Sequence, residues 1–170
     1  MEFYEVIKTR RSIRSYKDTP IPEETLKRVM EAARIAPSGH NRQFWKFYIV
    51  ESEKKRKVAE ACGNQMWIAK APAVIVAVGW KVPFSRGGYM GEITFTMDVS
   101  IAFTQLILAA RAEGLGTCWI GDFSNDKVKK ALGLPDEEYV VAVTPIGYPD
   151  KGVFSENTKR KSLDEIVERI

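Results

Sequence analysis

The sequence is poor in the residues that build metal sites and disulfide frameworks. It contains only two cysteines, Cys62 and Cys118, which stand far apart in apolar stretches, and a single histidine, His40. One histidine cannot assemble a histidine-based metal centre, and a catalytic triad would depend on that residue alone. The cysteines are therefore interpreted as buried free thiols, which favours a reducing, cytoplasmic setting.

Long hydrophobic runs and targeting segments are also lacking. The longest apolar run, residues 72–79, is far shorter than the ~20 residues that span a bilayer. Residues 1–6 show no uninterrupted apolar run after a basic start, so they are not typical of a signal peptide. The sequence therefore predicts a protein without a membrane anchor or targeting segment.

The composition is that of an ordinary globular protein. A chain of 170 residues with 45% hydrophobic and 28% charged residues is long enough to bury a core and predicts one domain. Its net charge of +4 suits an anionic ligand or a nucleic acid, but a solvated surface rich in lysine and glutamate would carry the same charge. Net charge alone does not choose between these interpretations.

Hydrophobic periodicity predicts mixed helices and strands without a regular βαβ rhythm. Helices are expected over residues 2–9, 22–36, 53–62, 93–113, 125–132 and 162–170, strands over 45–51, 72–79, 117–120 and 139–146, and a mobile loop over 84–90. The 93–113 helix is too apolar for a surface position, so it is expected at the centre or in a subunit interface. This order favours a mixed sheet with helices packed around it over a doubly wound parallel sheet.

Three polar segments depart from the pattern of a plain surface. Residues 10–14 read Arg-Arg-Ser-Ile-Arg, and guanidinium forks with a hydroxyl match the oxygens of a phosphate. Residues 37–45 offer neutral donors and acceptors beside Trp45, which suits a sugar alcohol chain or a heteroaromatic ring. Residues 158–161, Thr-Lys-Arg-Lys, place cations where the next helix should begin, and a bound anion would resolve that conflict. Taken alone, residues 10–14 are better interpreted as a solvated basic turn, residues 37–45 as a capped loop and residues 158–161 as plain surface.

Together these segments form an ordered set with the glycine-rich stretch 114–121. Arg-Arg-Ser-x-Arg near the start, Pro-Ser-x-x-Asn-x-Gln-x-Trp after the second helix, and Arg160 ahead of Leu-Asp-Glu-Ile-Val resemble the nitroreductase family of flavoproteins over essentially the whole chain. The resemblance implies an α+β fold with a mixed, mostly antiparallel sheet flanked by helices. It also implies a homodimer that holds FMN non-covalently at the subunit interface, with residues 1–170 as one FMN-binding domain.

The resemblance also assigns roles to individual residues. The FMN phosphate would be bound by Arg10, Ser12 and Arg160, with Arg11 and Lys159 as weaker candidates nearby. Arg14 and Asn64 would lie at the pyrimidine edge of the flavin, and the backbone of Ile120 and Gly121 would approach its N5 and O4 atoms. The other subunit would contribute Pro37, Ser38, Gly39, Asn41 and Gln43.

The implied activity is hydride transfer from NADH or NADPH to a nitroaromatic, a quinone or a similar small acceptor by a ping-pong mechanism. No catalytic side chain and no metal are assigned, because the cofactor carries the chemistry and water can supply protons. Trp67 stands where some members have a lysine, the 80–93 segment is short, and no long exchanged C-terminal arm is expected, so the acceptor stays open. The alternatives are a flavoprotein of the same fold for dehalogenation, flavin storage or flavin degradation, and, least favoured, a basic nucleic-acid-binding domain.

Overall fold

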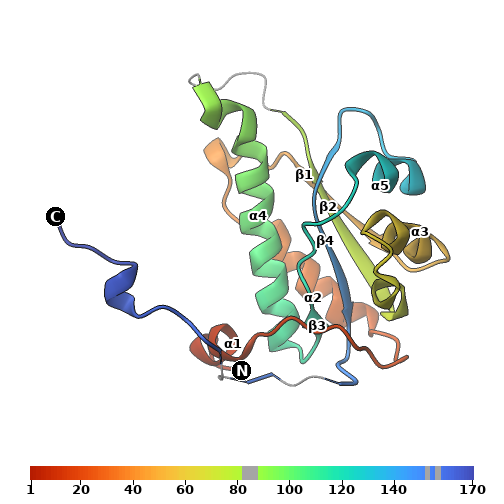
Figure 1. Cartoon of the computed structure of the whole chain (residues 1–170), viewed down its shortest axis with the longest axis horizontal. Coiled ribbons are helices and arrows are strands. Elements are labelled where there is room, and N and C mark those ends of the chain that lie inside the picture. The colour runs from red at the N-terminus through yellow and green to blue at the C-terminus, as the bar shows by residue number, and fades with distance from the viewer. Residues whose placement is uncertain (82–87, 152–153, 156–157) are drawn as a thin grey trace.

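The structure is a computed structural model that describes residues 1–81, 88–151, 154–155 and 158–170 (Figure 1). Its helices are α1 (Phe3–Thr9), α2 (Glu23–Arg34), α3 (Lys54–Ala61), α4 (Gly88–Ala112) and α5 (Asn125–Leu132). Its strands are β1 (Trp45–Val50), β2 (Ala73–Gly79), β3 (Gly116–Thr117) and β4 (Tyr139–Gly147). Short 3-10 turns occur at η1 (Gly39–Asn41), η2 (Met66–Lys70) and η3 (Leu163–Glu165).

The described strands form one sheet in the order β1-β2-β4-β3, and each pair of neighbours is antiparallel. A parallel bridge between Ser12 and Thr117 adds the N-terminal segment beyond β3. The predicted α+β fold with a mixed, mostly antiparallel sheet is therefore confirmed.

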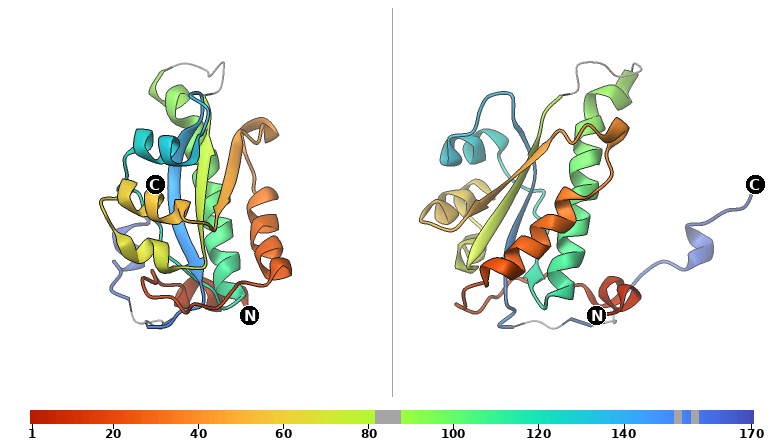
Figure 2. Two further views of the ribbon diagram at one scale, coloured as in Figure 1. Left: turned by 90° about the vertical axis from the view of Figure 1, so that its right-hand side faces the viewer. Right: turned by 180° about the vertical axis from the view of Figure 1, so that it is seen from behind.

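Helices cover both faces of this sheet, so the fold has three layers (Figure 2). The side chains of β2 alternate between the two cores: Ile75 and Ala77 pack with α2 and α4, whereas Val74 and Val76 pack with α3 and α5. Every residue of β2 is buried, as the continuous apolar run predicted. Burying each large aliphatic side chain stabilises the fold by about 1.5–3 kcal/mol.

The long helix α4 lies along one face of the sheet beside α2 (Figures 1 and 2). It confirms the apolar helix predicted over 93–113, although it begins earlier, at Gly88. By length and composition alone, Ile93–Ala112 is also the one stretch of the described chain that could cross a bilayer. Phe103 and Leu106 are fully buried against the sheet, which is the packing of a core helix.

Two predicted boundaries in the middle of the chain are wrong. The strand expected over 117–120 ends at Thr117, because the Cys118 N–H donates to the Thr144 hydroxyl at 3.0 Å and so leaves the backbone ladder. The mobile loop expected over 84–90 lies partly outside the described residues, and its last three residues belong to α4. Glycines at 88 and 91 lower the helix propensity there, so the sequence pattern hides this first turn.

The last predicted helix, over 162–170, is also wrong. Its capping box forms, with the Glu165 carboxylate accepting from the Ser162 N–H at 2.8 Å and from the Ser162 hydroxyl at 3.0 Å. Only the 3-10 turn η3 follows, and the segment projects away from the body of the chain (Figure 1). A short amphipathic helix needs a packing partner to persist, and every residue from Lys159 to Ile170 is exposed.

Candidate functional site

The N-terminal arginine segment lies directly against β3. Ser12 forms a parallel bridge with Thr117, and the Ile13 N–H donates to the Thr117 carbonyl at 2.9 Å. A Cβ at Gly116 would lie 2.8 Å from the Cβ and Cγ1 atoms of Ile13. The absence of a side chain at Gly116 is therefore what lets the two segments come together.

Tyr16 also holds the arginine segment in place. Its hydroxyl donates to the Ile13 carbonyl, and the ring packs with Ile13 and Ala71 in a small core of their own. Burial raises the pKa of Tyr16, the nearby Cys118 raises it further, and Arg14 lowers it. The hydroxyl therefore remains a neutral donor at physiological pH, and the backbone that carries the arginines is held in place.

The side chains of this segment face outward to different degrees. Arg10 is half-buried and Ser12 and Arg14 are exposed, so all three can reach a ligand from one stretch of backbone. Arg10 also lines a pocket of about 420 Å³ between α1 and α4. The other residues of that pocket are Ile7, Thr104, Ile107, Leu108 and Trp119.

The aromatic neighbour of Arg14 is Trp67, the residue that stands where some family members have a lysine. The Arg14 guanidinium carbon lies 5.9 Å from the centre of the ring of Trp67, a residue of η2. Such a cation–π contact contributes about 0.5–1 kcal/mol at an exposed site. Trp67 therefore restrains Arg14, whereas a lysine at position 67 would repel it.

The turn at Asn64 adjoins the stretch that contains Gly121. Gly63 and Asn64 both have left-handed backbones, with φ of 66° and 58°. A Cβ at Gly63 would lie 3.9 Å from a carboxylate oxygen of Asp122, whereas a Cβ at Gly121 would meet nothing within 4 Å. Ile120 is held to β4 by paired backbone hydrogen bonds with Val143 of 2.8 and 3.2 Å. The backbone at Gly121 is thus fixed on one side and open on the other.

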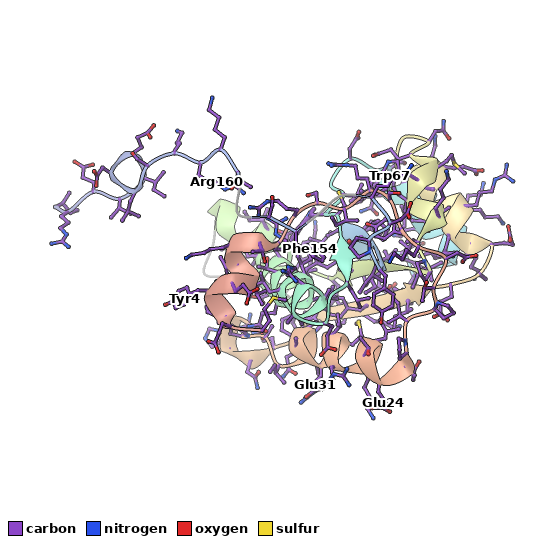
Figure 3. All side chains as sticks on the ribbon, turned by 90° about the horizontal axis from the view of Figure 1, so that it is seen from below. Tyr4, Glu24, Glu31, Trp67, Phe154 and Arg160 are labelled. Atoms are coloured by element: carbon purple, nitrogen blue, oxygen red, sulfur yellow. The ribbon has the colours of Figure 1, made fainter. Side chains whose placement is uncertain are left out.

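The chain returns to the arginine segment near its C-terminal end. The ring of Phe154 stacks on the guanidinium of Arg111 at 4.0 Å, and Arg111 Nε donates to the Thr9 hydroxyl at 3.0 Å. Lys159 and Arg160 follow shortly afterwards, both exposed, at the start of the projecting segment (Figure 3). The structure thus brings the root of this segment to the end of α1, and it shows no contact between Arg160 and Arg10.

The 37–43 loop occupies a different part of the molecule. It holds three residues with left-handed backbones, His40, Asn41 and Gln43, a conformation that costs roughly 1–2 kcal/mol for each non-glycine residue. Its Gly39 N–H donates to the carboxylate of Asp98 on α4 at 3.1 Å. Asp98 and Arg111 are thirteen positions apart on that helix, which is about 20 Å at 1.5 Å per residue. Within one chain the loop and the arginine segment therefore lie near different positions along α4.

Sequence reasoning missed Asp98, although a signal was present. It is the only charged residue between Ile93 and Ala110, and its exposed fraction is 6%. A lone acid in an otherwise apolar helix indicates a buried acceptor with a specific donor. No cluster of three or more histidine, cysteine or acidic side chains suited to a metal occurs in the described part of the chain.

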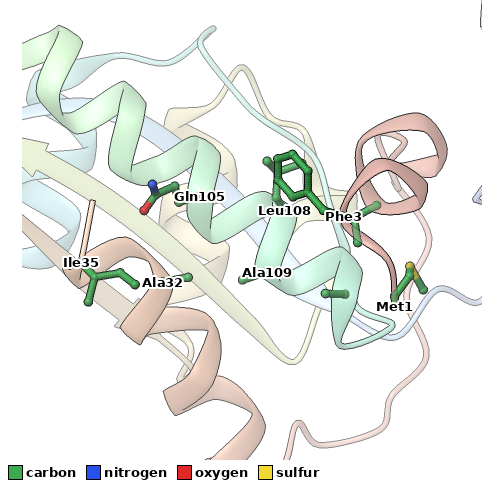
Figure 4. A pocket seen from close by; sticks show the side chains of 9 residues that line it. Met1, Phe3, Ala32, Ile35, Gln105, Leu108 and Ala109 are labelled. Atoms are coloured by element: carbon green, nitrogen blue, oxygen red, sulfur yellow. The ribbon is translucent and has the colours of Figure 1, made fainter. Parts of the chain in front are cut away.

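A second pocket, of about 400 Å³, lies between α1, α2 and α4 and is mostly apolar (Figure 4). Phe3, Ile35, Leu108 and Ala109 line it, together with Gln105. The Gln105 Oε1 atom is buried and accepts no hydrogen bond from the described residues. The lining residues Phe3 and Ile35 are exposed, and Met97 and Ile101 of α4 are exposed as well. An unsatisfied acceptor beside exposed apolar side chains is typical of a surface that another chain covers.

Comparison with known proteins identifies the fold. The family model described as Nitroreductase family matches residues 7–148. A protein of Archaeoglobus fulgidus, described as a candidate NADH dehydrogenase/NAD(P)H nitroreductase, is 34% identical over 97% of this chain and 96% of its own. Iodotyrosine deiodinase 1 of Rattus norvegicus is 30% identical over 98% of this chain and 68% of its own.

A solved structure agrees with these sequence comparisons. The FMN-dependent nitroreductase of Clostridium difficile R20291 superposes with a TM-score of 0.78 and is 26% identical, covering 96% of this chain and 94% of that protein. The arrangement of helices around the antiparallel sheet is therefore shared with this solved structure.

Proposed function

The chain belongs to the nitroreductase family, and from this we propose that it is an FMN-dependent oxidoreductase that passes electrons from NADH or NADPH to a small acceptor such as a nitroaromatic or a quinone. The observation that carries the proposal is the arginine segment docked on β3. The open backbone at Gly121 follows that strand four residues later in the chain. The name of the Clostridium difficile protein supports FMN, and that of the Archaeoglobus fulgidus protein supports a nicotinamide donor.

The residues present fit a flavin mononucleotide. Arg10 and Ser12 offer charge-assisted and hydroxyl donors from one fixed stretch of backbone, which suits the phosphate, with Arg11 close by. Lys159 and Arg160 add cations at the root of the C-terminal segment, after Phe154 has brought the chain back to α1. A dianionic phosphate bound at Arg10 and Ser12 would attract Lys159 and Arg160 toward the arginine segment.

The flavin ring would lie beside Ile120 and Gly121. A ring can approach the backbone of Ile120 and Gly121 because no side chain would fill the space beside Gly121. Arg14, restrained by Trp67, and the left-handed turn at Asn64 would then lie at the polar edge of that ring. A cation there stabilises the negative charge that a reduced flavin carries.

Bound FMN would supply the hydride chemistry by accepting electrons from the nicotinamide and passing them to the acceptor in alternate half-reactions. The chain's own residues would hold the cofactor and set the charge around it. No side chain is assigned as an acid or a base, and water supplies the protons that the acceptor takes up.

We propose that the active form is a homodimer in which the 37–43 loop of one subunit completes the site of the other. The loop carries Pro37, Ser38, Gly39, Asn41 and Gln43, and it lies far along α4 from the arginine segment of its own chain. The exposed apolar residues of α1 and α4 support a surface for the second copy, and so does the buried Gln105 acceptor, which has no hydrogen bond from the described residues. Residues 1–170 would form one FMN-binding domain per subunit, acting in the cytoplasm, where free thiols such as Cys62 persist.

Colour and oligomeric state test this proposal together. The purified protein should be yellow, or become so with added FMN, and should have the mass of a dimer by light scattering. Under anaerobic conditions NADH or NADPH should bleach the flavin, and a nitroarene or quinone should restore its colour. A protein that neither binds excess FMN nor dimerises would contradict the proposal, and one that binds FMN without turnover would instead be a storage protein.

The second candidate is reductive dehalogenation in the same cradle. It is favoured by the similarity to iodotyrosine deiodinase 1 over nearly the whole of this chain. A survey of acceptors with the reduced protein, including a halogenated phenol, separates the two. Halide release faster than nitroarene reduction would select the second candidate.

A further inference from the structure

Asp98 holds a position that the family resemblance does not explain. Its carboxylate is buried within the apolar helix α4, where its neighbours Val99 and Ala102 pack into the core. Burying a charge in such surroundings is unfavourable unless specific donors meet it. Among the described residues, the Gly39 N–H of the 37–43 loop donates to Oδ1 at 3.1 Å.

The loop that receives this contact is irregular and held by its own polar groups. Its 3-10 turn η1 spans three residues only, so it has few internal partners for its first N–H groups. The Gln43 N–H donates to the Ser38 hydroxyl at 3.0 Å, and the Gln43 side-chain amide donates to the Asn41 carbonyl at 3.0 Å. These bonds fix the shape of the loop, but they join only residues within it.

The bond from Gly39 to Asp98 is different because it joins the loop to the core. It links positions 59 residues apart and caps the first N–H of η1 from a rigid helix. We propose that Asp98 is a positioning residue, which holds the 37–43 loop in its cofactor-binding shape before FMN arrives. The inference rests on the proposed function and deepens it, since the loop is the part of the site offered to the partner subunit.

Preorganisation of this kind should appear in the affinity for FMN. If the anchor is removed, the left-handed residues of the loop sample other conformations, and FMN binding must order them again. Asp98→Ala should therefore raise the Kd for FMN by about tenfold, the scale of one lost hydrogen bond to a charged group. Asp98→Asn keeps an acceptor oxygen and should bring the Kd back to within about threefold of the wild type.

A matched control is available elsewhere in the chain. Glu138 is equally buried, with an exposed fraction of 6%, and accepts hydrogen bonds from the Tyr48 hydroxyl at 2.7 and 2.9 Å. Glu138→Ala should lower the thermal stability but leave the Kd for FMN unchanged. A rise in Kd that is as large in Glu138→Ala as in Asp98→Ala would reduce the effect to general destabilisation and overturn the inference.

The donor side gives a second variant if Asp98→Ala folds poorly. Gly39→Pro removes the N–H and leaves Asp98 intact, and proline is accepted at the first position of a helical turn. Ser38 before it already has the extended backbone that a following proline requires, with φ −142° and ψ 159°. This variant should raise the Kd for FMN as Asp98→Ala does.

The experiment is a titration of the FMN-free dimer by quenching of flavin fluorescence, together with amide hydrogen exchange over residues 38–43. Faster exchange in FMN-free Asp98→Ala and its recovery in Asp98→Asn are expected. Wild-type protein that does not bind FMN would contradict the proposed function itself. Wild-type protein that binds FMN, with Asp98→Ala and Gly39→Pro binding equally well, would overturn only the role of Asp98.

Discussion

Gly116 is the residue whose substitution tests the architecture of the candidate site most directly. An added Cβ would lie 2.8 Å from two atoms of Ile13 and 2.9 Å from a third, whereas carbon atoms pack at about 3.5–4.0 Å. In Gly116→Ala the arginine segment must therefore move away from β3 by roughly 0.7 Å or more, since both partners are backbone-anchored. Overpacking of this kind costs about 1–3 kcal/mol.

That cost should be visible in two independent measurements. For a chain of this length, a loss of about 2 kcal/mol lowers the Tm by roughly 4–8 °C in a thermal melt of the FMN-free protein. The shift also displaces Arg10 and Ser12, so the Kd for FMN should rise by about tenfold, as for the loss of one hydrogen bond.

Gly121→Ala provides the contrast, because its Cβ would meet no atom of the protein within 4 Å. This variant should keep the wild-type Tm and still weaken FMN binding, since the added methyl group occupies the space proposed for the flavin. Gly116→Ala with wild-type Tm and wild-type FMN affinity would refute the docking of the arginine segment on β3.

Three further predictions follow from single side chains. Arg10→Ala should weaken FMN binding by about 2 kcal/mol without changing the Tm, and an unchanged affinity in the titration would place the phosphate elsewhere. The hydrogen bond from Arg28 lowers the pKa of Glu113, so this pair stabilises the fold above the unfolded pKa of the carboxyl group and ceases to do so as the pH falls through the lowered folded value. Melts of Glu113→Gln should therefore lie below the wild type near neutral pH and converge with it in acid, and a constant difference would contradict this linkage. Burial raises the pKa of Cys62 to about 11, so its thiol should react with an aromatic disulfide reagent only as fast as the protein unfolds, and rapid labelling of the folded protein would disprove its burial.

The layers of the fold could be predicted because they depend on local patterns. The apolar run of β2 and the periodicity of α2 are local patterns that each extend over about a dozen residues or fewer. The structure has both elements with nearly the expected bounds. The 162–170 helix could not be predicted in the same way. Its capping box is local and forms, but persistence of the helix depends on a surface to pack against, which an isolated chain does not offer.

The candidate site could likewise be predicted only in part. Motif spacing names Arg10, Ser12 and Asn64, because a family resemblance carries residue identities from one sequence to another. It says nothing of Gly116 against Ile13 or of Asp98 against Gly39, pairs that are joined only when the chain folds. These supporting contacts set the geometry of the candidate site, and they can be identified only from the folded structure.

The proposal that two subunits share each cofactor site has a thermodynamic consequence. In the proposed arrangement the arginine segment and the 37–43 loop of one chain would contact two different FMN molecules, so a lone subunit would offer FMN only part of its contacts. If the dimer completes the site, cofactor binding and association each favour the other by the same free energy. Ligand bound across the interface then stabilises a surface that exposes Phe3, Met97 and Ile101 when it is alone. In the proposed dimer, the exposed apolar residues and the shared cofactor site would both follow from pairing two copies of this chain.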